Sequence, residues 1–298
     1  IFETGRHYDA FCVFDADNLV HLDFLAVMNT RLMKGQKVLQ GYLSAKNPVD
    51  TWVSGTFAIA FWTVNHLWHL GKYNLGLSSC LGGTGMCISA DIVREFGWGC
   101  DCLTEDMEFS MKCLSHGIRT CWVHDAIIYD EKPLTFMASW RQRKRWAQGQ
   151  FDCSERYIPI LMKEGFKRHS IVVLDGIMQL LQNYFLLISA FYLVMTYINM
   201  FYPCFTVVLY NDALVPRQFW SVLGTIQYVL PLIVLLQIEV PAKIYLYWLI
   251  YPVFMYSWVP VTFLGWIHRH EKQWVHTIHT RSMQFQAASL TRKKEIDS

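Results

Sequence analysis

Three long stretches without charge constrain the fold of this chain more than any other feature. Residues 176–211, 218–238 and 244–267 contain no Asp, Glu, Lys or Arg. Each is long enough to cross a bilayer as a helix, because a span needs about 20 predominantly apolar residues. Buried helices of a soluble domain are the alternative, but three such runs in succession are hard to bury. The sequence therefore predicts transmembrane helices over residues 171–267, three in number, or four if the first run is split near Pro203.

The segment before the first apolar run is basic, and this orients the chain. Residues 132–168 contain nine Lys or Arg and three acidic residues. Positively charged residues beside a membrane span stay on the cytosolic side. The sequence therefore predicts a multi-pass protein of the cell (plasma or inner) membrane with its N-terminal part in the cytosol. Nine cysteines without a C-x-x-C pair fit reduced thiols there. A net charge of +2 is too small to indicate nucleic-acid binding.

Before residue 133, segments with strand and helix patterns alternate. We expect strands at 11–14 and 37–44, helices at 19–34 and 51–70, a short strand followed by a helix from Asp91, a helix from Thr104 to Gly117, and one long strand or a strand pair over 119–131. The continuous apolar run "FCVF" at 11–14 predicts a strand buried on both faces. Gly35 would end the first helix as a C-cap. This alternation predicts an α/β domain over residues 1–132.

A basic helix connects this domain to the apolar runs. Residues 133–150 have an amphipathic pattern that opens with Pro133, which suits the first helical position. We therefore divide the chain into the α/β domain, amphipathic interface helices at 133–170, transmembrane helices at 171–267 and a basic tail at 268–298.

The stretch "FDADN" follows the first expected strand. Asp15 and Asp17 would lie at the carboxyl end of that strand, where ligands bind in open α/β sheets. Two carboxylates separated by the small Ala16 suit a hard divalent cation, Mg²⁺ or Mn²⁺. The alternative is that Asp17 or Asn18 caps the helix that follows.

The stretch "LTEDMEF" opens another expected helix. Thr104 suits the N-cap, and Glu105 and Asp106 stand in the first turn, where the helix dipole favours ionised carboxylates. Ordinary capping is one interpretation of this pattern. A carboxylate placed as a general base is the other.

The stretch "GGTGM" contains Gly83, Thr84 and Gly85 in a glycine-rich turn. Glycines let the backbone approach a ligand closely. The spacing matches neither G-x-G-x-x-G nor the P-loop, so a phosphate-binding fingerprint is excluded. A tight turn without a ligand is the alternative.

The stretch "QRKRW" fits the pattern Q-x-x-R-W with Gln142, Arg143, Arg145 and Trp146. Arginine forks bind phosphate oxygens through two hydrogen bonds. A tryptophan face offers a platform for the apolar face of a sugar ring. The basic helix therefore combines a membrane-proximal position with side chains that suit a sugar phosphate.

These motifs, in this order and followed by apolar spans, resemble the membrane-embedded glycosyltransferases of family 2, the group of cellulose, hyaluronan and poly-N-acetylglucosamine synthases. The resemblance is close over residues 8–160. It implies an α/β fold with a GT-A-type (Rossmann-like) catalytic domain, of which this chain would hold the C-terminal part only, followed by an all-α transmembrane region. The first nucleotide-binding strands would lie upstream of Ile1.

The resemblance also implies an activity. Such hexosyltransferases transfer a sugar with inversion, and with a divalent cation, from a nucleotide-sugar donor, usually a UDP-sugar, to a growing polysaccharide that is exported processively. Two alternatives stay open: transfer of one sugar to a lipid carrier without processivity, and an inactive membrane scaffold. The expected partners are the donor, a polysaccharide or lipid-linked acceptor and the lipid bilayer, with no nucleic acid.

The resemblance assigns roles to the motif residues. Asp15 and Asp17 would hold the nucleotide and Mg²⁺ or Mn²⁺, and Asp106 would be the general base, oriented by Glu105 and Thr104. The remaining matches are the acceptor-side turn Gly83, Thr84 and Gly85, and the diphosphate- and acceptor-binding residues Gln142, Arg143, Arg145 and Trp146.

Two weaker expectations concern the rest of the chain. Trp274, Thr277 and His279 match a cytosolic loop that inserts over the bound nucleotide in some relatives, although an amphipathic surface segment explains them equally well. Polar residues along one edge of the first span would face a sugar chain: Asp175, Gln179, Gln182 and Asn183.

Overall fold

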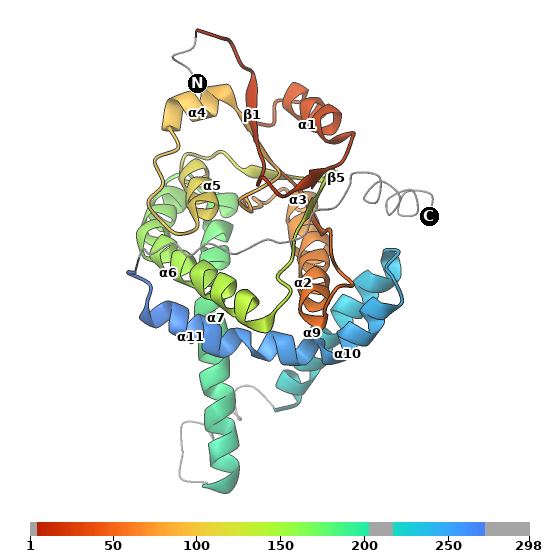
Figure 1. Ribbon diagram of the computed structural model, residues 1–298. Helices are drawn as coiled ribbons and strands as arrows, with labels where there is room; N and C mark the ends of the chain where they lie inside the picture. The colour runs from red at the N-terminus through yellow and green to blue at the C-terminus, as the bar shows by residue number, and fades with distance from the viewer. Residues whose placement is uncertain (1–4, 203–216, 272–298) are drawn as a thin grey trace.

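The computed structural model describes residues 5–202 and 217–271 (Figure 1). Its first part is built on a five-stranded mixed sheet of order β1-β4-β3-β5-β2. The strands are β1 (Ala10–Val13), β2 (Leu19–Val20), β3 (Val38–Ala45), β4 (Met86–Ser89) and β5 (Thr120–Asp130). β3 and β5 run parallel, while the other neighbouring strands pair antiparallel. The structure confirms the coarse part of the predicted fold class, an α/β domain with a mixed sheet and helices.

The helices of the sheet domain follow the alternation expected from the sequence. They are α1 (Phe24–Met33), α2 (Trp52–Thr63), a π-helical turn (Val64–His69) that continues into α3 (Leu70–Asn74), α4 (Ala90–Phe96) and α5 (Glu105–Ser115). The expected stop before Gly71 is wrong, because the helix runs on to Asn74 and is followed by Gly76, whose φ of 71° favours glycine. The expected C-cap at Gly35 is confirmed by its φ of 81°.

The first strand and the first helix correct the sequence analysis. Among the described strands β1 lies at the edge and pairs with β4 alone, and its Val13 is 37% exposed, so it is not buried on both faces. Residues 19–20 form β2, so the first helix starts later than expected. Its buried face carries Phe24 and Met28, whereas Leu25 is 63% exposed. Pairing with the sheet therefore overrides the apparent helical spacing of the first residues.

β3 forms the centre of the sheet domain, and all eight of its residues are buried. Its pairing with β5 is interrupted where Gly41 pairs with Val123 but the next residue, Tyr42, pairs with Ile127. A Cβ on Gly41 would lie 2.5 Å from the carbonyl oxygen of Ala126, so only glycine fits beside this bulge. The expected strand over 119–131 is thus one long strand with a bulge.

The basic helix α6 (Phe136–Lys167) is longer than predicted and begins at a different residue. Thr135 is its N-cap, and the Thr135 side chain accepts a hydrogen bond from the Ala138 N–H at 3.2 Å. Pro133 lies before this cap and not at the first helical position. The helix continues past residue 150 because it packs against α5, α7 and α11 along its length.

The apolar runs form α7 (Ile171–Phe201), α9 (Arg217–Gln237), α10 (Lys243–Tyr256) and α11 (Trp258–Ile267). Among the described residues, 171–198 and 243–267 are long and apolar enough to cross a membrane, whereas 222–237 is shorter. In Figure 1, α7 projects away from the sheet, and α10 and α11 run across the base of the sheet domain. There α10 packs against α2, and α11 packs against α6.

Two residues of the polar edge of α7, Asp175 and Gln179, contact the rest of the protein. Asp175 accepts a hydrogen bond from the Lys72 ammonium of α3 at 2.7 Å. The Gln179 side-chain oxygen accepts one from the same ammonium at 3.4 Å, and the Gln179 main-chain carbonyl accepts one from the Gln150 side-chain amide of α6 at 3.1 Å. The expectation that this edge faces a sugar chain is therefore wrong at these two residues, which dock α7 onto the sheet domain.

Candidate active site

Three carboxylates meet at one end of the sheet. Asp15 and Asp17 lie in the turn between β1 and β2, and Asp130 ends β5. One oxygen from each lies within 4.8 Å of the others. Because β1 and β2 occupy opposite edges of the sheet, the turn over residues 14–18 runs across the ends of the strands between them and meets β5. Sequence reasoning missed Asp130, although its place at the carboxyl end of a strand was a usable signal.

The aspartate turn is fixed by a buried lysine. The Lys46 ammonium, at the end of β3, donates to the main-chain carbonyl of Asp17 at 2.9 Å. The same ammonium forms an ion pair with Glu131 at 3.0 Å, and both side chains are at least 95% buried. Neither Asp17 nor Asn18 caps the following helix, whose N-cap is Asp23, so the capping alternative is excluded.

Asp130 is held from two sides. The Lys132 ammonium lies 2.9 Å from one carboxylate oxygen. The Asn18 side-chain amide donates to the other oxygen at 3.2 Å. These contacts orient the carboxylate toward the aspartate turn and leave lone pairs on both oxygens for a cation.

The glycine-rich turn links the two acidic motifs. The Thr84 hydroxyl accepts a hydrogen bond from the Asp15 N–H at 3.1 Å and donates a short one to the Asn18 side chain. Gly83 has a φ of 81°, and a Cβ there would lie 3.4 Å from an Asp106 carboxylate oxygen. One turn therefore touches the candidate metal group on one side and the candidate base on the other.

Asp106 lies in the first turn of α5, as predicted. Burial raises its pKa to about 7, and the neighbouring Glu105 carboxylate adds to the increase. The Met107 N–H and the positive charge of Arg145 act in the opposite direction. A carboxyl group that exchanges its proton near neutral pH is suited to general-base chemistry.

α5 and α6 approach each other closely at the start of α5. Thr104 occupies the expected N-cap position, but its hydroxyl makes no capping hydrogen bond and is buried. A Cβ on Gly149 of α6 would lie 2.7 Å from the Thr104 main-chain nitrogen. Glycine at 149 therefore allows α6 to pass directly over the residues that carry Asp106.

Three residues of the Q-x-x-R-W motif share one face of α6, since positions i, i+3 and i+4 lie together on a helix. Arg145 is near enough to Asp106 to lower its pKa. The Gln142 side-chain oxygen is buried and accepts no hydrogen bond within the described residues. The Trp146 ring packs edge-on against Phe57 of α2, with centroids 6.0 Å apart, and beside Phe61 at 6.3 Å.

Arg143 is not part of this face, which corrects the expectation that it binds the diphosphate. It is fully buried, and its guanidinium donates to the Ser257 hydroxyl at 2.8 Å, where α10 meets α11. The rings of Phe136, Phe254 and Trp258 surround it at 5.7, 4.5 and 5.1 Å. Burial lowers its pKa to about 10. Of the two arginines in this motif, Arg145 is the one whose charge acts on Asp106, and its diphosphate role stays a prediction.

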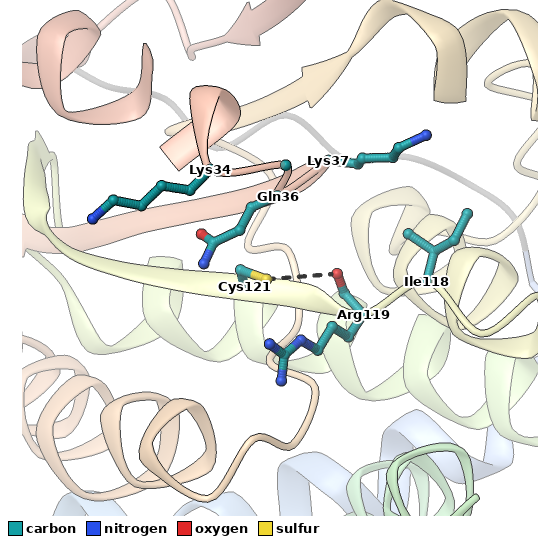
Figure 2. Close-up of a pocket in the computed structure, with 7 residues that line it drawn as sticks. Lys34, Gln36, Lys37, Ile118, Arg119 and Cys121 are labelled. Atoms are coloured by element: carbon teal, nitrogen blue, oxygen red, sulfur yellow. Dashed lines mark hydrogen bonds between the residues drawn. The ribbon is translucent and has the colours of Figure 1, made fainter. Parts of the chain in front are cut away.

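The weak loop match at Trp274, Thr277 and His279 lies outside the described residues. A hollow of about 320 Å³ lies at the opposite end of the sheet, where β3 and β5 begin. Residues 34–37, Ile118, Arg119 and Cys121 line it, and Figure 2 shows the Lys34, Gln36 and Arg119 side chains around it. It contains none of the predicted site residues.

The mixed sheet, with a carboxylate turn at its end and a buried acid at a helix start, is consistent with a GT-A-like domain of a glycosyltransferase. A profile of the family described as "Glycosyl transferase family group 2" matches residues 10–266. The chain therefore belongs to this family of glycosyltransferases. The predictions of family 2 membership and of a glycosyltransferase enzyme are confirmed.

A curated relative agrees with this family. The "Probable glycosyltransferase YdaM" of Bacillus subtilis (strain 168) is 26% identical over 144 residues. The match covers 47% of this chain and 34% of the relative, so the chain spans about a third of the relative's length. Donor, acceptor and processivity stay predictions.

Proposed function

We propose that the protein transfers a sugar with inversion from a UDP-sugar to an acceptor hydroxyl at the cytosolic face of a membrane. The observation that carries this proposal is the glycine-rich turn, which joins the carboxylate group to Asp106. A donor held at the carboxylates and an acceptor beside Gly83 would meet next to a carboxyl group with a pKa of about 7.

The proposed reaction is a single displacement. The acceptor oxygen forms a bond to the anomeric carbon while the bond from that carbon to the diphosphate oxygen breaks. The electron pair leaves with the nucleoside diphosphate, and the acceptor proton passes to Asp106. A positioned base is needed because an unactivated sugar hydroxyl is a weak nucleophile. Glu105 and the close packing of Thr104 against Gly149 orient Asp106.

The residues at the sheet end suit a divalent cation. Three carboxylates offer hard oxygen ligands, as Mg²⁺ and Mn²⁺ prefer, so Asp15, Asp17 and Asp130 would hold the ion. When bound, it supplies positive charge to the leaving diphosphate. Arg145 adds charge from α6, and Trp146 forms an aromatic wall for the sugar.

The membrane part is proposed as multi-pass, with the catalytic domain in the cytosol. The length and apolarity of residues 171–198 and 243–267 support this arrangement. Processive synthesis with export of a polysaccharide stays the leading proposal because of the likeness of the motif series to polymer synthases. Transfer of one sugar to a lipid carrier is the second candidate. It gains support from α7, whose polar residues Asp175 and Gln179 contact Lys72 of the sheet domain.

The test uses the complete protein in membranes or detergent with Mn²⁺ or Mg²⁺. UDP-glucose, UDP-N-acetylglucosamine and UDP-glucuronate are offered separately and together, and UDP release and product size are recorded. Release of UDP with a long polymer supports the synthase. Release with single-sugar adducts supports the lipid glycosyltransferase. A folded sample that turns over none of these donors contradicts transfer from a UDP-sugar of these classes.

A further inference from the structure

Two lysines are buried among the carboxylates of the candidate site. Lys46 is 8% exposed and Lys132 is 2% exposed. Lysine is almost never buried without a partner, because taking its charge out of water is costly. Around them lie four acidic residues, Asp15, Asp17, Asp130 and Glu131.

The two lysines differ in what holds them. Lys46 contacts the Asp17 main-chain carbonyl and Glu131, so its ammonium fixes the turn and a carboxylate outside the candidate metal group. Lys132 contacts the carboxylate of Asp130, which belongs to the candidate metal group. A cation at that group would therefore compete with Lys132 for the same carboxylate.

The position of Lys132 is set by its main chain and not by this ion pair alone. Its N–H donates to the Asn47 side chain at 2.8 Å, and its carbonyl accepts from the Asn47 amide at 2.8 Å. Its ammonium lies 3.4 Å from the centre of the Phe61 ring. An ammonium has three N–H donors; among the described residues one goes to Asp130 and another faces the Phe61 ring, so one is left on a side chain that is 2% exposed. The group thus keeps capacity for an anionic ligand.

The charges around Lys132 and its position between two parts of the site indicate which ligand it would bind. Four carboxylates against two ammonium groups leave two negative charges at the sheet end, which matches one divalent cation. On its other side, Lys132 touches Phe61, the ring that packs beside Trp146. The ammonium therefore lies between the candidate metal group and the sugar-binding face of α6, where the diphosphate of a donor would lie. Arg143 was expected to supply a second positive charge there, but its guanidinium lies against Ser257, where α10 meets α11.

We propose that Lys132 is a further residue that binds the nucleotide-sugar donor, an inference that rests on the proposed function. Its ammonium binds a diphosphate oxygen of the donor once a divalent cation occupies the group that includes Asp130. The cation and the lysine then share the leaving diphosphate from two sides, while Lys46 keeps the aspartate turn in place.

The test compares Lys132→Met with the wild type in the complete protein, purified in detergent. Mn²⁺ binding is measured by electron paramagnetic resonance, and UDP binding at saturating Mn²⁺ by calorimetry. We expect Mn²⁺ affinity to stay the same or to increase, because a competitor for Asp130 is removed. We expect UDP affinity to fall about 10- to 100-fold, since one charge-assisted hydrogen bond is lost. A fall in UDP affinity without a fall in Mn²⁺ affinity indicates that Lys132 binds the ligand. A purely structural role would weaken the binding of both Mn²⁺ and UDP.

Two further variants keep the test decisive. Lys132→Gln retains a donor toward Asp130 but no charge, so it should fold where Lys132→Met does not and still lose UDP affinity. Lys34→Met, at the exposed far end of the sheet, should leave both affinities unchanged. Unchanged UDP binding in Lys132→Gln, or equal loss of Mn²⁺ and UDP, overturns the inference. A wild type that binds no UDP with Mn²⁺ overturns the proposed function itself, and the inference with it.

Discussion

At the scale of single residues, Asp106 shows how burial prepares a carboxyl group for proton transfer. Its pKa of about 7 lies well above that of an exposed aspartate because enclosure disfavours the charged form. A base must be deprotonated to accept the acceptor proton. The rate of transfer should therefore rise with pH through about 7 and level off above it, measured as kcat for UDP release between pH 5.5 and 8.5. A flat profile in this range would contradict the assignment of Asp106 as the base.

Replacing the same residue separates activity from stability. Asp106→Asn should lower kcat by about 10²- to 10⁴-fold, the usual contribution of a general base. The variant should remain folded. Since the folded state holds the proton more tightly than the unfolded chain, ionisation of Asp106 penalises folding as pH rises from about 4 to about 7. The variant lacks this penalty, so at pH 8 it should unfold at a temperature equal to or above that of the wild type.

Much of the site could be predicted residue by residue because its motifs are short and local. Asp15, Asp17 and Asp106 stand at strand or helix ends, and the structure joins them through Thr84 and Gly83. The strand-end position of Asp130 was a usable signal, but its meeting with Asp15 and Asp17, and the contact of Lys132 with it, could not be found from spacing, since they arise only when β5 pairs with β3 and β2. Contacts made by strand pairing leave no local pattern in the sequence.

At the scale of elements, α6 presents different chemistry on its two sides. Arg145 faces Asp106, and Arg143 faces α10 and α11. Arg145→Met should lower kcat about 10²-fold, because positive charge beside the developing anion is lost. Arg143→Met should leave kcat and the donor KM within about threefold. Stability should be unchanged or higher, since a buried cation that has no acidic partner among the described residues is replaced by an apolar group of similar length.

The two α6 variants serve as matched controls for each other, because they differ by one helical face. Steady-state UDP release and thermal unfolding are measured for both. Equal losses of turnover would mean that Arg143 reaches the diphosphate in the substrate-bound protein. The helical period does not separate position 143 from position 146, since i and i+3 are neighbours on a helix, so the burial of Arg143 among aromatic rings could not be predicted from the motif spacing.

The contact between α5 and α6 depends on one glycine. Gly149→Ala would place a methyl group 2.7 Å from the Thr104 main-chain nitrogen, so backbone must move. We expect a loss of about 1–3 kcal/mol in stability and reduced turnover, because the start of α5 carries Asp106. Gly71→Ala is the control, since a Cβ there meets nothing within 4 Å. Equal behaviour of the two variants would refute the close packing of α6 on α5.

At the scale of the whole molecule, a largely buried ion pair joins the sheet domain to α7. The side chains of Lys72 and Asp175 are 6% and 18% exposed. Removing one partner of a buried pair costs about 3–5 kcal/mol. Lys72→Met should therefore lower the unfolding temperature strongly, and Lys72→Met/Asp175→Leu should recover much of the loss. Lys37→Met, which breaks the exposed pair with Asp91, should change it little. A small effect of Lys72→Met on the unfolding temperature would show that other contacts hold α7 to the sheet domain.

The ion pair between Lys72 and Asp175 bears on how deeply α7 could enter a membrane. α7 has 31 residues, which at 1.5 Å per residue make about 46 Å, more than the roughly 30 Å of a bilayer's hydrocarbon layer. Its first turns carry Asp175 and contact the sheet domain, so in a membrane they would stand outside the hydrocarbon and only the remainder would cross it. The pair would then set how far Asp106 lies from the lipid headgroups. Every acceptor, whether a polymer or a lipid-linked sugar, would have to present its hydroxyl at that fixed distance from the headgroups.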